Sequence, residues 1–462
     1  MVRTGHAVVL GASLAGLVAA RVLSEAYERV TVVDRDAMPG AAAPRRGVPQ
    51  SRQLHVLLSR GREALDELFD GLSAELHGYG APVVDLNEQV HWYNDGYRMR
   101  RERTDLVGVG VSRPLLEYAV RERVRALPNA RFHPPAEATA LLTTGDRVIG
   151  VLVTPREGTA HRIEADLVVD ACGRASRSPA WLTALGYRTP REERVGIDVT
   201  YVTRLYERDP RHLEGLMGAL TNAVPGRPRT GIVAALEDDR FAVALSGVLG
   251  EQPPLDDEGF QRFADSLGVP LISDLVREAT PIGEPARMRY PESVRRRYER
   301  LRRFPRGYLV LGDALCSFNP VYGQGMTVAA TEGLLLRKLL TGDRDRLWHA
   351  FFRGAAKLID GPWSIAVGTD LRFPEVDGPR TIRTRLVNAY VHRLHAAAQT
   401  DAVLGTAFLR VLNLVDPPHR LLRPQILRRV LGRRPAPAAA PTPGAAGVRS
   451  RRSSRAGSRP SG

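Results

Sequence analysis

Residues 6–35 constrain the fold of this chain more than any other stretch. They begin with a short apolar run over 6–10, which leads into a glycine-bearing turn and then a helical run. A second apolar run over 30–33 follows and ends in the acidic residue Asp34. This order of strand, turn, helix, strand and acid is typical of a βαβ dinucleotide-binding unit.

Each position in this unit has a physical reason. Gly11 permits a tight turn, and Gly16 lets the helix approach the sheet closely. Ser13 stands where the G-x-G-x-x-G pattern has its second glycine, and its hydroxyl could donate to a phosphate. Free N–H groups at the helix start attract the anion, and a carboxylate at the position of Asp34 accepts hydrogen bonds from an adenosine ribose. The alternative is an ordinary βαβ turn without a nucleotide.

The net charge of +15 arises mainly at the C-terminal end. Residues 417–462 contain eleven Arg and no acidic residue, and the same segment has no aromatic side chain to stack on bases. We therefore predict no nucleic-acid binding. Residues 420–431 alternate leucine with arginine and predict either a helix packed on the body or a contact with an acidic surface or membrane. Residues 433–462 have the composition of a disordered basic tail.

Several kinds of site and segment are not expected. The two cysteines, Cys172 and Cys316, cannot build a disulfide framework, and no Cys/His cluster has zinc-ligand spacing, so no metal is predicted. No apolar run is long enough to span a membrane. Glycines interrupt the apolar start of the chain, which argues against a signal peptide. These features predict a cytoplasmic protein in a reducing compartment.

The remaining pattern predicts an α/β fold with an α+β insertion. Residues 186–299 contain alternating apolar and polar stretches, which suit a half-exposed antiparallel sheet. We expect a helix over about 54–69 and a hairpin over 89–99. The predicted domains are a discontinuous dinucleotide-binding domain over 1–185 and 300–350, a substrate domain over 186–299 joined by the hairpin at 86–104, a helical region over 351–432, and the tail.

Two further expected strands end in acids. The strand over 165–170 ends in Asp170, with Gly173 shortly after it, and the strand over 307–311 is followed by Asp313. A turn at Asn319-Pro320 and two glycines then open a helix. Such an arrangement would place Asp313 beside a polyol and backbone donors beside an anionic ring. The alternatives are a plain strand exit and a loop that enters a buried helix.

Two groups of basic and polar residues leave a choice open. Arg45, Arg46, Gln50 and His55 either contact a cofactor or cover a turn. Arg113 precedes Pro114 at a predicted helix start, where an arginine either clamps phosphate or lies on the surface.

The three motifs in this order resemble those of the single-component FAD-dependent monooxygenases with the para-hydroxybenzoate hydroxylase fold, over about residues 5–345. Three segments, 46–50, 170–177 and 317–324, are also similar to those of bacterial epoxidases that act on polyene precursors of polyethers such as monensin and lasalocid. The resemblance implies a Rossmann-like FAD-binding domain, an antiparallel-sheet substrate domain and a C-terminal helical region. FAD would be the cofactor and NAD(P)H the co-substrate.

The resemblance also implies residue roles. The pyrophosphate would lie at the turn over 11–16, the ribityl chain at Asp313, and the flavin pyrimidine edge at the backbone of 323–326. The segment at Asp170 would serve both FAD and NAD(P)H, although Ala171 and Cys172 depart from the common Asp-Gly start. The residues assigned to the cofactor are Gly11, Ser13, Gly16, Asp34, Arg35, Arg113, Asp170, Asp313, Gly323, Gly325 and Met326. No side chain is assigned to catalysis, and the loop candidates are Asn319, Pro320, Arg46 and Gln50.

By the same resemblance, NAD(P)H reduces FAD, O2 forms a flavin hydroperoxide, and one oxygen atom passes to an apolar polyketide- or terpenoid-like small molecule, free or carrier-bound, in specialised metabolism. Alkene epoxidation needs no protein base, only a dry pocket that positions the double bond. Three alternatives stay open: an FAD-dependent hydroxylase of an aromatic substrate, a flavin reductase or cyclase on the same scaffold, and a binding protein that uses its basic C-terminal region at a membrane or nucleic acid.

Overall fold

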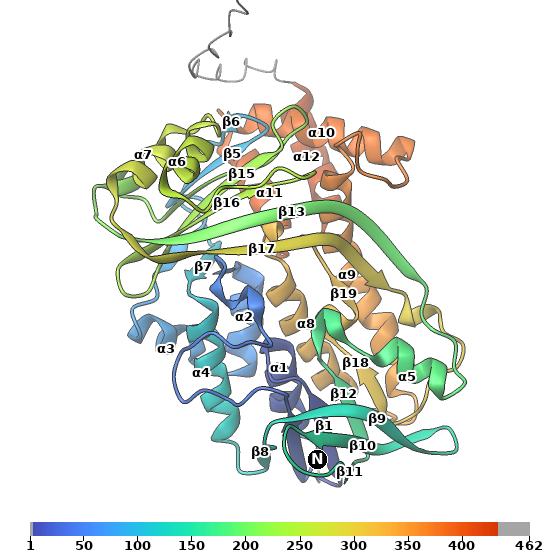
Figure 1. Cartoon of the computed structure of the whole chain (residues 1–462). Coiled ribbons are helices and arrows are strands. Elements are labelled where there is room, and N and C mark those ends of the chain that lie inside the picture. The colour runs from blue at the N-terminus through green and yellow to red at the C-terminus, as the bar shows by residue number, and fades with distance from the viewer. Residues whose placement is uncertain (1–2, 433–462) are drawn as a thin grey trace, which may run out of the picture.

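The computed structural model describes residues 3–432 (Figure 1). It confirms the α/β fold class, with a parallel sheet, a separate antiparallel sheet and a helical C-terminal region. The tail predicted over 433–462 lies outside the described residues. Within residues 3–432, no helix combines the length and the apolarity needed to cross a membrane.

A five-stranded parallel sheet forms the base of the molecule, in the order β18-β12-β1-β2-β8. The central strand β1 is buried along its whole length, as its apolar sequence requires. Because the strands are parallel, the turns that follow β1, β12 and β18 meet at one edge of the sheet. The strands are β1 (His6–Leu10), β2 (Arg29–Val33), β8 (Ala130–Phe132), β12 (Leu167–Asp170) and β18 (Tyr308–Val310).

Helices and two small sheets surround this base. Helix α1 is buried on most of its faces because α8 and α4 pack against it. The helices here are α1 (Leu14–Leu23), α2 (Ser59–Leu68), α3 (Leu72–Gly78), α4 (Arg113–Arg125), α5 (Ser178–Ala184) and α8 (Gly325–Leu339). One small sheet contains β3 (Val56–Leu57), β7 (Val107–Gly110) and β4 (Val83–Asp85), and the other contains β11 (His161–Glu164), β10 (Arg147–Pro155) and β9 (Ala136–Thr144).

The prediction of a helix over 54–69 is wrong at its N-terminal end. Helix α2 begins only at Ser59, and the residues before it run extended as β3, paired with β7. The apolar residues Leu57 and Leu58, which sequence periodicity assigned to the helix, are instead buried in the strand and at the boundary between strand and helix. A short apolar run fits either element, and the pairing with β7 decides.

An eight-stranded sheet lies above the base, in the order β19-β17-β13-β16-β15-β14-β5-β6. The two long strands β13 and β17 pair with each other and run from this sheet back toward the base (Figure 1). The hairpin of β5 and β6 joins the same sheet through β14. The strands are β5 (Val90–Asn94), β6 (Tyr97–Arg98), β13 (Glu192–Glu207), β14 (Gly218–Thr221), β15 (Arg229–Leu236), β16 (Arg240–Gly247), β17 (Pro281–Arg296) and β19 (Cys316–Ser317).

Helices cover both faces of this sheet. Helices α6 (Asp257–Asp265) and α7 (Pro270–Glu278) pack on one face around Phe260, Leu267 and Ile272. The C-terminal helices pack on the other face, where Leu394, Leu404 and Leu409 meet Trp92 and Leu220. These helices are α9 (Leu347–Asp370), α10 (Ile382–Ala398), α11 (Ala402–Leu412) and α12 (Pro424–Leu431).

Candidate functional site

One cavity of about 2080 Å³ lies between the parallel sheet, the antiparallel sheet and the C-terminal helices. It is larger than the roughly 300–1,000 Å³ of a typical small-molecule pocket, so it has room for a cofactor and a substrate together. Most of the residues predicted for the site line it, and the structure brings them together from distant parts of the chain. They are Gly11, Ser13, Asp34, Arg35, Gln50, Arg113, Asp313, Asn319, Pro320, Gly323, Gly325 and Met326.

The turn after β1 is packed so closely that both of its glycines are required. Gly11 has φ +96°, and a Cβ there would lie 2.6 Å from the carbonyl oxygen of Ala171. A Cβ at Gly16 would overlap the carbonyl oxygen of Gly11. Helix α1 therefore starts directly against the turn after β12, with its first N–H groups at the wall of the cavity.

Ser13 belongs to a buried charged cluster that the sequence did not reveal. Its hydroxyl donates to Glu117 Oε1 at 2.5 Å and accepts from Arg113 Nη2 at 2.9 Å. Arg113 Nε also donates to Glu117 at 2.8 Å. The hydroxyl proton of Ser13 is therefore directed at Glu117 rather than at a phosphate. The signal for Glu117 was its position four residues after Arg113, which places both on one face of α4.

Arg45, and not Arg46, completes this cluster. Arg45 is buried, and its Nη2 donates to Ala12 O at 2.9 Å and to Glu117 at 3.2 Å. Arg46 is exposed and does not line the cavity, and its role as a loop candidate stays a prediction. Burial alone would raise the pKa of Glu117, but Arg113 and Arg45 more than offset this and lower that pKa.

Asp34 directly follows β2, and its carboxylate already accepts hydrogen bonds from backbone N–H groups. Its Oδ2 accepts from the backbone N–H of Ala12 at 2.7 Å, and its Oδ1 accepts from Asp36 N at 2.9 Å. The side chain stays partly exposed in the cavity wall, and the exposed Arg35 lines the cavity next to it. The predicted contacts of both residues with an adenosine ribose stay predictions, and the placement is compatible with them.

Asp170 does not line the cavity. It is fully buried, and its carboxylate accepts from Cys172 N at 2.9 Å, from Ser176 Oγ at 2.6 Å, from Ser178 Oγ and from Tyr308 OH. These donors account for its acceptor positions. A direct contact of Asp170 with FAD stays a prediction, and the geometry favours an indirect role in which Asp170 holds the turn of residues 171–178.

Asp313 has the opposite placement. It lines the cavity in the turn after β18 and forms no hydrogen bond with any residue in the described range 3–432. Burial raises the pKa of Asp313, and Arg113 and Arg174 partly offset that rise. An unpartnered carboxylate in a cavity wall is suited to accept hydrogen bonds from a polyol.

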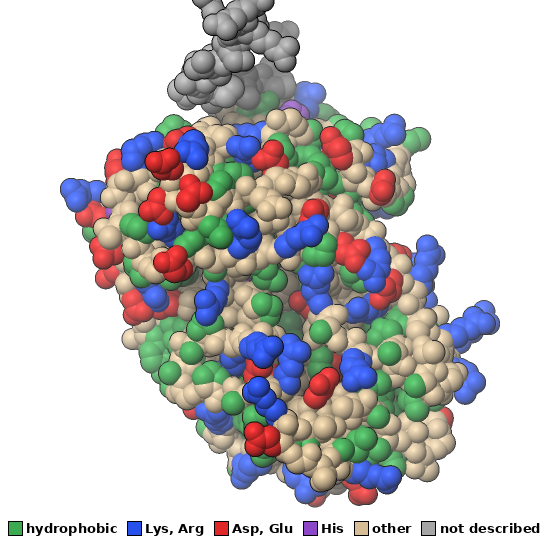
Figure 2. All heavy atoms as spheres, in the orientation of Figure 1, with side chains coloured by type: hydrophobic (Ala, Val, Ile, Leu, Met, Phe, Trp, Pro, Cys, Tyr) green, Lys and Arg blue, Asp and Glu red, His purple; other side chains and the backbone are tan. Residues whose placement is uncertain are grey.

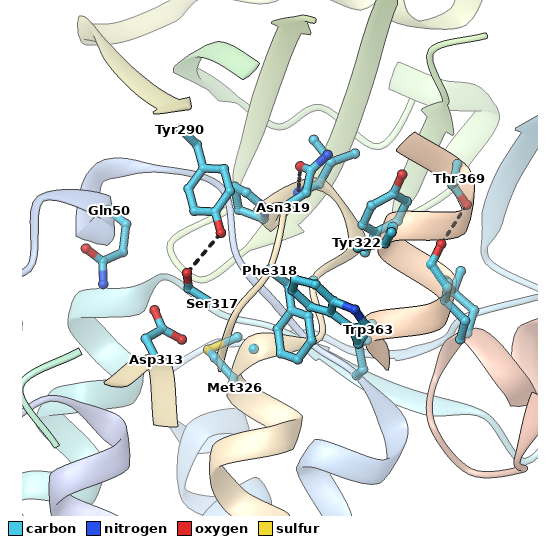
Figure 3. A pocket seen from close by; sticks show the side chains of 18 of the residues that line it. Gln50, Tyr290, Asp313, Ser317, Phe318, Asn319, Tyr322, Met326, Trp363 and Thr369 are labelled. Atoms are coloured by element: carbon cyan, nitrogen blue, oxygen red, sulfur yellow. Dashed lines mark hydrogen bonds between the residues drawn. The ribbon is translucent and has the colours of Figure 1, made fainter. Parts of the chain in front are cut away.

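The segment from Ser317 to Met326 lines the middle part of the cavity (Figure 3). Ser317 accepts a hydrogen bond from Tyr290 OH at 3.2 Å, which ties the loop to β17. Asn319 caps the following turn by accepting from Val321 N at 3.2 Å, and Gly323, at φ +66°, then leads into α8. No side chain caps the start of α8, so its first N–H groups are available beside Gly325 and Met326.

Asp370 supports this loop from the end of α9. Its Oδ1 accepts from Asn319 Nδ2 at 3.2 Å and from Tyr322 OH at 2.9 Å, while its buried Oδ2 has no partner among the described residues. Burial raises the pKa of Asp370 to about 7. No sequence motif marks Asp370, which lies 44 residues beyond Met326, the last predicted site residue.

Beyond the loop, the cavity becomes mostly apolar. The side chains there come from the antiparallel sheet and from helices α9, α10 and α11, and they include Trp92, Leu220, Ile232, Ile365, Tyr390, Phe408, Val411 and Leu412. We call this part the apolar lobe. It also contains His395, which is 5% exposed; its Nδ1 lies 2.7 Å from Asp95 Oδ2, and its Nε2 has no partner among the described residues.

These features fit FAD at the other end of the cavity. The uncapped starts of α1 and α8 present N–H groups suited to a pyrophosphate and to the electron-rich edge of a flavin ring. Asp313 offers an unpartnered acceptor between them. The described residues contain no group of His, Cys, Asp and Glu side chains that could hold a metal ion.

Comparisons with known proteins agree with this reading. A model of the family described as FAD binding domain matches residues 5–342. The chain is 36% identical over 434 residues to Protein Rv3254 of Mycobacterium tuberculosis, which covers 89% of this chain and 90% of that protein. It is 31% identical over 378 residues to kynurenine 3-monooxygenase of Salinispora arenicola, covering 74% of each chain.

The fold also matches solved structures. The structure of the flavin-dependent brominase Bmp2 covers 88% of this chain and 93% of its own, with a TM-score of 0.63 and 15% identity. At this identity the likeness concerns the fold alone.

Proposed function

Because this chain belongs to the FAD-binding-domain family of FAD-dependent monooxygenases, we propose that it transfers one oxygen atom from O2 to an apolar polyketide- or terpenoid-like molecule, most simply by epoxidation of an alkene, with NAD(P)H as the reductant. One observation carries the proposal: the FAD end and the apolar lobe are parts of a single cavity.

When bound and reduced by NAD(P)H, FAD would supply the electrons that activate O2, and O2 would supply the oxygen atom that is transferred. The residues of this chain hold and orient it. Backbone N–H groups at the start of α1 would hold the pyrophosphate, Asp313 would accept hydrogen bonds from the ribityl hydroxyls, and the start of α8 would hold the pyrimidine edge. Burial of Arg45, Glu117 and Arg113 fixes the turn that presents the first of these groups.

The lining of the apolar lobe supports an apolar substrate. Trp92, Leu220 and Phe408 offer no charge to an amino acid or other zwitterion. The nearby cation Arg372 is already paired with Asp95. A substrate that fills this space is therefore mostly hydrocarbon, and its positioning and the exclusion of water are what the protein contributes to the oxygen transfer.

His395 stands in the wall of the lobe with its Nδ1 held by Asp95, and its unpartnered Nε2 is buried, so that nitrogen is not open to a substrate. The substrate can be free or attached to a carrier.

The test is oxygen transfer with isotopically labelled O2. Purified FAD-loaded protein, supplied with NADPH and a set of apolar polyenes, is expected to yield products that have gained one labelled oxygen atom and contain an epoxide by fragmentation. Aromatic hydroxylation of a phenol, with no product from any polyene, would favour the hydroxylase. Consumption of NADPH without labelled product would favour a reductase.

One likeness favours a second candidate. The fold is also similar to that of the Diels-Alderase PyrE3, with a TM-score of 0.59 and 18% identity. A non-redox cyclase on this scaffold would convert its substrate at constant mass and without NADPH, which the same experiment detects.

A further inference from the structure

Four apolar side chains stand exposed where the C-terminal helices meet solvent. Ile382 is 78% exposed, Leu386 66%, Val387 46% and Leu422 53%. We call these four residues the α10 patch. Ile382 and Leu386 are four residues apart, so they share one face of α10. Single exposed apolar residues are common, but several large ones gathered together mark an interaction site.

The α10 patch also borders the cavity. All four of its residues line the cavity that contains the apolar lobe. Side chains that are about half exposed or more cannot stand deep inside the protein, so the cavity opens to the outside between these residues. The apolar lobe therefore has an entrance framed by hydrocarbon.

The surroundings of the patch are basic. Residues 371–432 contain ten Arg and four acidic residues. Arg383 and Arg385 on α10, and Arg423 and Arg428 near α12, are exposed and form no ion pair with any residue in the described part of the chain. Two of the four acids, Asp401 and Asp416, already pair with Arg429 and Arg410.

Figure 2 shows hydrophobic and basic side chains side by side over α10, at the upper right of the molecule, with a few acidic ones among them. We propose that the α10 patch docks this protein on an anionic lipid surface, so that an apolar substrate passes from the bilayer through the patch into the apolar lobe. The transfer step rests on the proposed function, whereas the docking itself does not.

The combination of exposed apolar side chains and unpaired arginines suits a lipid interface. Such an interface accepts apolar side chains among its acyl chains and arginines among its anionic headgroups. Ile382 is the first residue of α10 and projects into solvent, and a bilayer deforms around such a projection. A second copy of this chain would instead bring two surfaces rich in unpaired arginine together, which repel each other.

Helix α12 lies next to this surface but packs on the body of the protein. Its residues Ile426 and Val430 are buried, so the segment over 420–431 packs on the body, as one of the two sequence alternatives predicts. Leu422, at the start of this segment, belongs to the α10 patch, and the main contact with lipid is assigned to the three exposed apolar residues of α10. This distinction can be tested directly because the two elements can be changed separately.

The test is flotation of the full-length FAD-loaded protein with vesicles of phosphatidylcholine alone or mixed with phosphatidylglycerol. We expect binding to the anionic vesicles only, weakened by high salt. The double variant Ile382→Ser, Leu386→Ser should bind at least about tenfold more weakly, because two large apolar side chains no longer insert. Arg383→Gln with Arg385→Gln should weaken binding severalfold.

Two controls assign the effect to the patch. Val83→Ser removes an apolar side chain that is 44% exposed on β4, and it should leave vesicle binding unchanged. A chain that ends at Gly432 lacks seven arginines of the segment 433–462 and should keep the sensitivity to Ile382 and Leu386. The absorbance of bound FAD in each variant shows that the cofactor end is intact.

Several results would overturn the proposal. One is the absence of binding to anionic vesicles, and another is equal binding by the Ile382, Leu386 double variant. Loss of all binding on truncation at 432, with no effect of the double variant, would assign adsorption to the tail. A dimer that Leu386→Ser dissociates in sedimentation velocity would assign the patch to a second copy. None of these measurements requires turnover, so failure of the proposed oxygen transfer would be seen separately.

Discussion

Asp170 and Asp313 follow neighbouring parallel strands and yet have opposite environments. Strand β12 pairs with β18, and Asp170 itself lies opposite Val310, three residues before Asp313. Asp170 is fully buried and accepts hydrogen bonds from its own turn. Asp313 faces the cavity and has no such bond to a residue of the described chain.

The difference lies in what holds each turn. Asp170 anchors the turn after β12 with its own carboxylate. The turn after β18 is anchored from behind, because Gly312 N donates to Glu332 Oε2 of α8 at 2.7 Å. The carboxyl group of Glu332 therefore holds this turn at Gly312. The carboxylate of Asp313 is left available for a ligand. Similar sequence patterns at two strand ends thus give a carboxylate that holds its own turn in one case and a carboxylate that faces the cavity in the other.

The strongest test of this contrast is Asp170→Ala. The substitution leaves the Ser176 and Ser178 hydroxyls and the Cys172 N–H without their acceptor inside the protein. We expect the free energy of unfolding to fall by about 3 kcal/mol, because unsatisfied buried polar groups cost roughly 1–3 kcal/mol each and partly relax. Urea denaturation of the FAD-free protein measures this change.

FAD affinity separates the two possible roles of Asp170. In the fraction of Asp170→Ala that folds, the dissociation constant for FAD should stay within a few-fold of the original value. Asp170→Asn keeps one acceptor oxygen and should lose less stability. If Asp170→Ala were as stable as the original protein but unable to bind FAD, the contrast would be reversed.

The second test is Asp313→Ala, which should affect binding and not folding. A hydrogen bond to a charged group contributes about 1.5–3 kcal/mol, so the dissociation constant for FAD should rise by roughly tenfold to a hundredfold. Quenching of flavin fluorescence on titration measures this. The FAD-free variant should be at least as stable as the original, because a half-buried carboxylate without a hydrogen-bond partner in the described chain is removed.

Asp313→Asn provides the matched control for this test. It keeps an acceptor of the same size without the charge, and its FAD affinity should lie between those of Asp313→Ala and the original protein. An unchanged affinity in both variants would show that the polyol is held elsewhere.

The sequence identified the strand ends but not how their side chains are used. The turn at Gly11, the strand ending in Asp170 and the loop from Asn319 to Met326 were all recognisable, because each depends on neighbouring residues. Whether an acid is buried depends on partners far away in the chain. Tyr308 and Ser178 surround Asp170, and no local pattern indicates that they meet.

The same limit explains the other differences. Arg45 and Arg46 are adjacent and chemically alike, and Arg45 is the one that is buried, against distant partners that include Ala12, Asp34 and Glu117. Asp370 supports Asn319 across 51 positions of sequence. The entrance of the apolar lobe lies in the C-terminal helices, beyond the segment in which the motifs occur. Long-range packing, and not local propensity, fixes each of these features.

The smallest expected effect is a pH dependence of the stability that arises from Glu332, the residue that anchors the turn of Asp313. Burial raises the pKa of Glu332 to about 8, so the folded protein holds a proton there that the unfolded chain, with its ordinary pKa near 4.5, has released at neutral pH. Stability from this group is complete below the unfolded pKa and is lost as the pH rises through the folded pKa. Between pH 6 and 7 the loss is about 1 kcal/mol, since one proton per molecule gives at most about 1.4 kcal/mol per pH unit.

Glu332→Gln should abolish this loss while it keeps an acceptor for Gly312 N. The free energies of unfolding of both proteins, measured with urea at pH 6 and pH 7, should therefore diverge by about 1 kcal/mol in favour of the variant at the higher pH. Asp370, whose pKa is raised to about 7, titrates in both proteins, so its contribution cancels in the difference. Parallel pH profiles would mean that Glu332 is ionised in the folded protein. In that case the turn of Asp313 would be held by a charged carboxylate at Glu332.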